Sequence, residues 1–297
     1  MKDRPVRHAA EFALFRAAEG ALRALPHPAA RRAGAALGSA LHALDGHHRR
    51  LVRRNLARAF PDWEPARRAA TTRACFRHFG AVFADTVSAL RLDAGRFCKL
   101  TASAGWEHLR AAEAEGRGVL VMSAHHGHWE MASWAIGAFH GPLQAMGRPA
   151  DNPRFDRWLT RLRTRFANVA LAKRGSVRAI LRALDDGARI GFLIDQRVRP
   201  RDGILVPFFG HPAWTSPLLA RLALRTGAPI VPVFADFAPG GGYRVTFAPP
   251  VELPAGEGEE AVAELTRRCL ALVEAATREA PERWFWLHDR WKGAPER

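Results

Sequence analysis

The sequence predicts an α/β protein with a mixed, largely parallel central sheet flanked by helices, preceded by a helical N-terminal extension. From Arg117 onward, short apolar or β-branched runs alternate with longer segments that have helical spacing. Runs that are apolar throughout indicate strands buried on both faces, and strand–helix alternation is typical of a parallel or mixed sheet. The residues before Arg117 have helical rather than strand patterns, which predicts the extension.

The expected elements follow one another along the chain without internal repeats. Strands are expected at residues 117–124, 141–147, 168–173, 188–195 and 228–237, with a late antiparallel strand in the glycine-led segment 240–250. Helices are expected at residues 129–139, 153–166, 176–186, 216–226 and 259–279. An aromatic segment, PERWFWLHDRWK, follows the last helix.

The charge of the chain is strongly positive. Its 297 residues include 45 Lys and Arg against 29 Asp and Glu, a net charge of +16. Residues 1–100 alone hold 19 basic and 8 acidic side chains. Such a field favours a phosphate-bearing or acidic partner, which could be nucleic acid, an anionic lipid surface or an acidic carrier protein. The three cysteines are odd in number and widely spaced, so we expect neither a disulfide framework nor a cysteine metal site.

The N-terminal region has no evident membrane span. Its longest early uncharged run, residues 33–44, is shorter than the roughly 20 apolar residues that a spanning helix needs. Before it, Phe12, Phe15, Leu22 and Leu25 lie near one face of a basic helix. Such a helix can lie in a membrane interface or pack on a core, and the pattern leaves both open. We therefore expect a membrane-associating region over residues 1–60 and a second domain over residues 61–297.

A histidine cluster, SAHHGHWE, follows the first expected strand. This is where α/β folds usually place their ligands. His126, His128 and Glu130 form an H-x-H-x-E run, which approaches the ligand pattern of zinc hydrolases but lacks a second ligand set. His125 and Glu130 are instead spaced as a general base and the carboxylate that orients it. No serine or cysteine nucleophile motif lies nearby, so the simplest chemistry is attack by a substrate hydroxyl on an acyl donor. Histidines that only cap the following helix are a third possibility.

Several motifs together resemble one family, the lipid A biosynthesis acyltransferases of the lauroyl and myristoyl type, within the lysophospholipid acyltransferase-like superfamily. They occur in the order of the family across roughly residues 50–292. The matching segments are RRLVRRNLARAFPDW, HHGHWE, RPADNP, LRTRFA, DQ, VPFFG and the terminal WLHDRWK. One departure is His128, where the family usually has Asn.

The resemblance implies roles for particular residues. His125 and Glu130 match the catalytic pair, and Arg163 matches an arginine expected to bind phosphate or to stabilise developing negative charge. Asp195 is expected to bind Arg163 or a substrate hydroxyl. The remaining residues expected to bind substrate are Arg148, Gln196, Phe208, Phe209, Gly210 and Thr215.

The implied activity is O-acyl transfer on a glycerolipid acyltransferase-like fold. The acyl donor would be a thioester of acyl carrier protein or CoA, and the acceptor a hydroxyl of a membrane glycolipid, a lipid A precursor. No metal or redox cofactor and no nucleic acid would be required. The protein would lie peripherally on the cytoplasmic face of the inner membrane, at an anionic surface. The alternatives are another acceptor such as a phosphatidylinositol mannoside or other lysolipid, a zinc-dependent hydrolase, and a basic nucleic-acid-binding protein.

Overall fold

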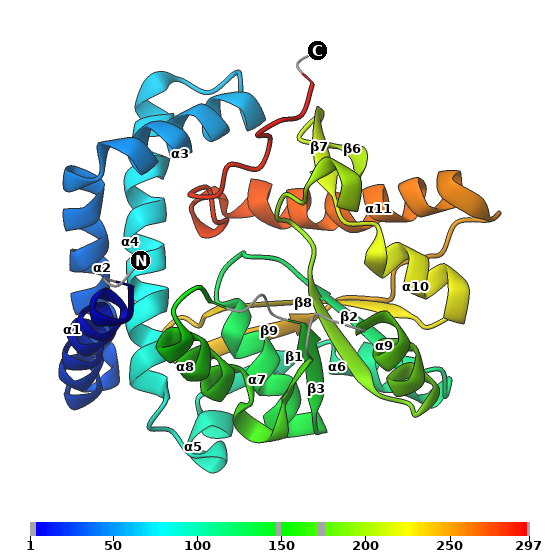
Figure 1. Ribbon diagram of the computed structural model, residues 1–297, viewed down its shortest axis with the longest axis horizontal. Helices are drawn as coiled ribbons and strands as arrows, with labels where there is room; N and C mark the ends of the chain where they lie inside the picture. Colours follow the sequence, from blue (N-terminus) through cyan, green and yellow to red (C-terminus); the bar gives the residue numbers. More distant parts are fainter. Residues whose placement is uncertain (1–3, 147–149, 172–175, 296–297) are drawn as a thin grey trace.

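The N-terminal helices gather at one end of the molecule in the computed structural model, which describes residues 4–146, 150–171 and 176–295 (Figure 1). They are α1 (Arg4–Ala24), α2 (His27–Leu44), α3 (Gly46–Ala59) and α4 (Pro65–Ala89). Glycines allow α2 and α4 to pack closely, because a Cβ atom on Gly38 would lie 2.1 Å from the carbonyl oxygen of Phe76. The boundary expected at residue 60 falls between α3 and α4, which pack on each other. No described helix is both long and apolar enough to cross a membrane.

The central sheet has seven strands in the order β1-β9-β8-β2-β5-β3-β4. Only the β8–β9 pair is antiparallel, which confirms the predicted mixed, largely parallel sheet. The strands are β1 (Thr101–Ala104), β2 (Val119–Ser123), β3 (Leu143–Met146), β4 (Val169–Leu171), β5 (Arg189–Leu193), β8 (Ile230–Phe237) and β9 (Tyr243–Phe247). All six predicted strands are present, and β1 was not predicted.

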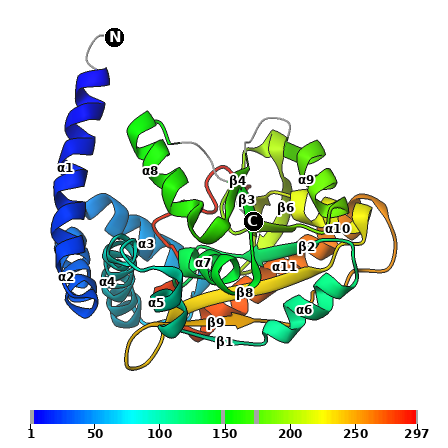
Figure 2. The same cartoon turned by 90° about the horizontal axis from the view of Figure 1, so that it is seen from below.

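Helices cover both faces of the sheet (Figures 1 and 2). They are α5 (Ala94–Lys99), α6 (Trp106–Ala114), α7 (Trp129–His140), α8 (Pro153–Arg163), α9 (Ser176–Asp185), α10 (Leu218–Thr226) and α11 (Gly258–Glu279). Side chains of β2 alternate between two cores, as a strand buried on both faces requires. Leu120 and Met122 belong to the core beneath α10 and α11, and Val119 and Val121 to the core beneath α7.

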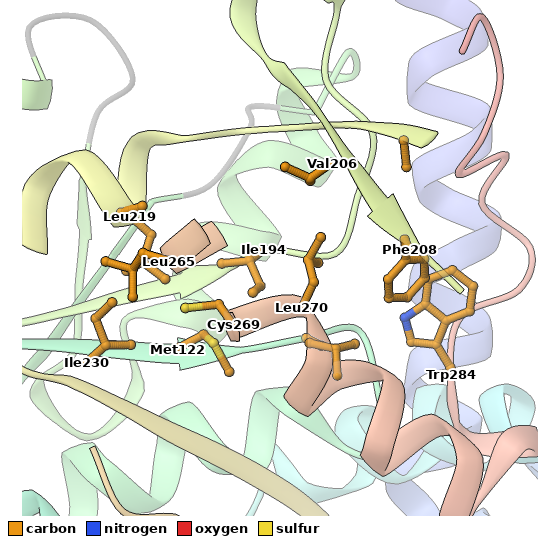
Figure 3. Close-up of a cluster of buried hydrophobic side chains, with 14 of the residues drawn as sticks. Met122, Ile194, Val206, Phe208, Leu219, Ile230, Leu265, Cys269, Leu270 and Trp284 are labelled. Carbon is orange, nitrogen blue, oxygen red and sulfur yellow. The ribbon is translucent and has the colours of Figure 1, made fainter. Parts of the chain in front are cut away.

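The core beneath α10 and α11 also holds two segments that lack a regular strand or helix signal (Figure 3). One is the hairpin of β6 (Ile204–Phe208) and β7 (His211–Thr215), which was not predicted. The other is the aromatic C-terminal segment, which enters the core after the short 3-10 helix η3 (Pro281–Arg283) and buries Trp284 and Trp286. Two further 3-10 turns, η1 (Arg165–Ala167) and η2 (Pro200–Asp202), follow α8 and β5.

Candidate active site

His125 and Asp195 meet at the carboxyl edge of the sheet. His125 follows β2 and Asp195 follows β5, and these two strands are parallel neighbours, so their carboxyl ends lie together. The Nδ1 atom of His125 lies 2.9 Å from Asp195 Oδ1, and the backbone N–H of His125 donates to Asp195 Oδ2 over 3.0 Å. The Trp284 indole also donates to Oδ2, over 2.8 Å. Asp195 thereby holds both the ring and the backbone of His125.

This arrangement fixes the tautomer of the imidazole. A carboxylate oxygen only accepts hydrogen bonds, so Nδ1 carries the proton and Nε2 is left with a lone pair. Burial alone raises the pKa of the Asp195 carboxyl, but the His125 charge, the His125 hydrogen bonds and the Trp284 indole outweigh it and lower the pKa. The Asp195 carboxylate therefore keeps its negative charge beside the His125 ring.

The carboxylate bonded to His125 is thus Asp195, and the expected pairing with Glu130 is wrong. No hydrogen bond joins His125 to Glu130 among the described residues. Glu130 lies on the first turn of α7 and lines a pocket together with His125 and Arg163. Burial raises the pKa of Glu130, and the charge of Arg163 offsets part of this increase. Among the described residues no hydrogen bond or ion pair joins Asp195 to Arg163, and the Asp195 carboxylate accepts its hydrogen bonds from His125 and Trp284.

The other two histidines of the cluster have different surroundings. The backbone of His126 pairs with Trp284, and burial lowers the pKa of its imidazole to about 4. His128 is fully buried, with its Nε2 atom 3.0 Å from Asp85 Oδ2. In the part of the chain that the structure describes, no group of three or more His, Cys, Asp or Glu side chains could hold a metal ion. The zinc interpretation of H-x-H-x-E therefore lacks a ligand set.

Asp85 of α4 is the centre of a buried polar network, called the Asp85 network below. Besides His128, its carboxylate accepts hydrogen bonds from the Tyr243 hydroxyl over 2.7 Å and from the Arg31 guanidinium over 3.0 and 3.1 Å. His27 Nε2 lies 3.1 Å from Asp85 Oδ1. Burial alone raises the pKa of Asp85, yet His128 and His27 lower it far below its ordinary value. The network joins α2, α4 and β9 to the loop that carries His125.

An apolar pocket of about 250 Å³ opens beside His125, between the sheet and helices α7 and α8. It is called the catalytic pocket below. Its polar side chains are those of Ser123, His125, Glu130, Ser133 and Arg163. The apolar side chains that line it include Val121, Trp129, Ile136, Leu143, Met146, Leu159, Phe192 and Val233. Such a pocket suits an alkyl chain whose reactive end lies at His125.

The structure places most of the other expected substrate-binding residues outside the catalytic pocket. Phe208 and Phe209 are buried in the core beneath α10 and α11, and Gly210 lies in the turn between β6 and β7. Thr215 is buried and accepts a hydrogen bond from Arg290. Gln196 follows Asp195 and is partly buried, but does not line the pocket. Arg148 lies outside the described residues.

Sequence reasoning missed two contributors to the site. From the sequence, Trp284 was noted only as part of an aromatic segment. In the structure its indole donates to Asp195, and its ring centroid lies 5.3 Å from that of Phe208. Phe208 therefore lies against the indole that donates to Asp195. Asp85 gave no motif, because its partners come from distant parts of the chain. The Trp-rich terminal motif was the one available signal for Trp284.

The fold thus places a histidine–aspartate pair beside an apolar pocket at the carboxyl edge of the sheet. Comparison with known families identifies the class of protein. Residues 2–293 match the family "Bacterial lipid A biosynthesis acyltransferase", so the chain belongs to that family and is an O-acyltransferase.

Similar proteins act on two kinds of glycolipid. The chain is 29% identical to the lipid A biosynthesis lauroyltransferase of Escherichia coli K12, over 92% of this chain and 88% of the relative. It is 26% identical to the palmitoleoyltransferase of the same organism, over 91% and 87%. It is also 27% identical to the phosphatidylinositol mannoside acyltransferase of Mycobacterium tuberculosis H37Rv, over 63% and 58%. Acyl transfer to a glycolipid is common to these names.

Proposed function

We propose that this protein transfers a fatty acyl chain from a thioester of acyl carrier protein or CoA to a hydroxyl of a lipid A precursor, with His125 as general base. The observation that carries the proposal is the His125–Asp195 hydrogen bond at the catalytic pocket, which leaves His125 Nε2 free to accept a proton. A lipid A acceptor is favoured over a phosphatidylinositol mannoside because the lipid A relatives align over most of their length.

The proposed reaction begins when Nε2 of His125 removes the proton of the acceptor hydroxyl. The hydroxyl oxygen attacks the thioester carbonyl carbon, and the Asp195 carboxylate stabilises the imidazolium that results. The negative charge on the carbonyl oxygen is stabilised by Arg163, which lines the same pocket. The C–S bond then breaks, the ester forms, and the imidazolium returns its proton to the departing thiolate sulfur.

The thioester supplies its own activation, so this chemistry requires no metal or redox cofactor. The protein contributes position, a base and a cation. The acyl chain would occupy the apolar part of the catalytic pocket, where Val121, Ile136 and Val233 are in reach. Glu130 acts on both His125 and Arg163 through its charge, without a hydrogen bond to either one in the described residues.

Peripheral binding to an anionic membrane, on the cytoplasmic face of the inner membrane, is part of the proposal. The rings of Phe12 and Phe15 pack on Phe155 of α8, at 5.3 and 4.9 Å between centroids, and remain partly exposed. The large apolar side chains that are exposed on α1 and α2 are Leu14, Leu37, Leu41 and Leu44. Three of them lie on α2 with helical spacing, and Arg49 of α3 donates to the carbonyls of His42 and Ala43 at the same end of α2.

A product assay tests the proposed activity. Purified protein is incubated with an acyl carrier protein thioester or acyl-CoA and with an extracted lipid pool that contains lipid A precursors and phosphatidylinositol mannosides. Mass spectrometry then identifies the lipid that gains an acyl group. The expected product is an acylated lipid A precursor that does not form with His125→Ala. Acylation of the mannoside alone would replace the acceptor, and thioester hydrolysis without a lipid product would overturn acyl transfer to a lipid.

A further inference from the structure

A second pocket, called the arginine pocket below, lies between α1 and α8, which Figure 2 shows next to each other. Its volume is about 260 Å³. Four arginines and two aromatic rings line it, namely Phe12, Arg16, Arg154, Arg157, Trp158 and Arg161. We propose that the arginine pocket binds a phosphate ester carried by the acceptor glycolipid. The identity of this ligand rests on the function proposed above, whereas the phosphate chemistry rests on the pocket itself.

The positive charge of the arginine pocket is only partly neutralised. Arg16 forms an ion pair with the buried Glu19. No carboxylate lies within ion-pair distance of Arg154, Arg157 or Arg161 among the described residues. These three arginines follow one another at spacings of three and four residues, so they share one face of α8 and repel one another. An anion bound between them would relieve this repulsion.

The aromatic contacts of α1 hold the pocket open. The rings of Phe12 and Phe155 meet edge to face at 5.3 Å between centroids, and those of Phe15 and Trp158 meet at 4.9 Å. They fix the distance between α1 and α8 before any ligand arrives. Guanidinium groups match the oxygens of a phosphate through two parallel hydrogen bonds, which makes Arg suitable for a phosphate ester.

The position of the arginine pocket points to the acceptor as the source of the phosphate. Helix α8 is shared by both pockets, because Leu159 and Arg163 line the catalytic pocket and Arg157 and Arg161 line the arginine pocket. Arg157 precedes Arg163 by six residues, about 9 Å along the helix axis. A phosphate bound there would lie on the same helix as Arg163, close to the pocket in which a hydroxyl of the glycolipid reacts at His125. The pantetheine arm of a thioester donor is longer and would carry its own phosphate further away.

The test compares Arg157→Gln/Arg161→Gln with Arg178→Gln/Arg182→Gln, a control pair of exposed arginines with the same spacing on α9. Acyl transfer is measured in uncharged detergent micelles with a phosphorylated acceptor glycolipid and with the same lipid after phosphatase treatment. We expect the first pair to raise KM for the phosphorylated acceptor by about tenfold or more, with kcat retained, since charge-assisted hydrogen bonds are lost. With the dephosphorylated lipid, the two variants and the parent protein should have the same KM.

Further measurements distinguish the possible sources of the phosphate. A thioester of N-acetylcysteamine, which carries no phosphate, replaces the usual donor. If the effect of the substitutions disappears with that donor, the phosphate belongs to the donor and the proposal is overturned. A loss of binding to anionic vesicles with unchanged KM values in micelles would also overturn it, because the arginines would then contact the bilayer surface.

Direct binding separates this proposal from the proposed reaction. Binding of the phosphorylated and dephosphorylated lipids to the His125→Ala protein is measured with and without the Arg157→Gln/Arg161→Gln change. Binding that depends on both the phosphate and the arginines supports the pocket even if no lipid is acylated. Equal binding of the two lipids, with or without the arginines, overturns the pocket even if acyl transfer occurs.

Discussion

His125 and His128 lie three residues apart in one loop, and each pairs with an aspartate from another part of the chain. The two pairs differ in their burial and in the other groups that contact the aspartate. His125, in the pair with Asp195, keeps 18% of its side chain exposed at the edge of the catalytic pocket. His128, in the pair with Asp85, is fully buried. The Asp195 carboxylate accepts hydrogen bonds from His125 and from the Trp284 indole. The Asp85 carboxylate accepts hydrogen bonds from Arg31 and Tyr243 in addition to its contact with His128. The difference teaches that access to a pocket, rather than the pairing itself, separates a proposed base from a structural clamp.

The largest expected effect concerns the two histidines. His125→Ala should lower kcat by about 10³- to 10⁴-fold, because the base and its proton path are lost. His128→Gln should keep most of the activity, since the Gln amide nitrogen can take the place of His128 Nε2 and still donate to Asp85. Steady-state kinetics and thermal unfolding of both variants measure this. Equal losses of kcat in two folded proteins would contradict the distinction between the pairs.

The two carboxylates near His125 provide the next test. Asp195→Asn should lower kcat by about 10²- to 10⁴-fold, because an amide that donates to Nδ1 reverses the tautomer. Glu130→Gln should lower kcat by only about tenfold, on the order of 1.4 kcal/mol, since Glu130 acts through charge alone. Single-turnover rates separate chemistry from binding. A larger effect at Glu130 than at Asp195 would restore the pairing predicted from the sequence.

Disrupting the Asp85 network should lower the free energy of unfolding of the protein. Asp85→Ala leaves the fully buried His128 and Tyr243, and the partly buried Arg31, without their carboxylate, and breaking such a buried charged network costs about 3 to 5 kcal/mol. Asp62→Ala, at an exposed position in the loop before α4, is the control and should change the free energy of unfolding little. Urea unfolding measures both. If Asp85→Ala is as stable as the control, the network does not hold the helices to the loop.

The smallest effect concerns His126 and His78, neither of which has a carboxylate partner among the described hydrogen bonds. Burial lowers the pKa of each imidazole to about 4, below the value of about 6.5 in an unfolded chain. The unfolded chain therefore binds more protons between pH 6.5 and 4, so stability falls as the pH decreases through this range. Each histidine contributes at most about 1.4 kcal/mol per pH unit. His78→Gln should reduce the slope of unfolding free energy between pH 7 and 5, and an unchanged slope would contradict this.

The sheet was largely predictable because its strands are apolar on both faces and are separated by clear helices. β1 was missed because its four residues, Thr101–Ala104, are mostly exposed and small. The β6–β7 hairpin contains Pro207 and Pro212, which argue against strands in a central sheet but are tolerated in a two-stranded ribbon. Pairing with β9 accounts for β1, and burial of Val206, Phe208 and Ala213 in the core accounts for the hairpin.

The sequence predicted His125 as a residue of the candidate site, but not the side chains that form hydrogen bonds with it. His125 was identified from its place after a strand and its spacing to Glu130. Its bond to Asp195 depends on β2 and β5 being neighbours, and the sequence does not show which strands are adjacent. The same limit applies to Asp85, whose partners lie on α2, β9 and the loop before α7. The family resemblance named Asp195 without revealing its partner.

The C-terminal aromatic segment has a consequence for biosynthesis. The Trp284 indole holds Asp195, the backbone of Phe285 donates to the His125 carbonyl, and Asn55 donates to the carbonyls of Trp286 and His288. The ribosome makes His125 and Asp195 well before Trp284, so a growing chain holds the reactive pair without the indole that secures it. A nascent chain would therefore acquire an ordered base only near the end of translation. Premature termination before Trp284 should yield a product that cannot consume acyl thioester in the cell.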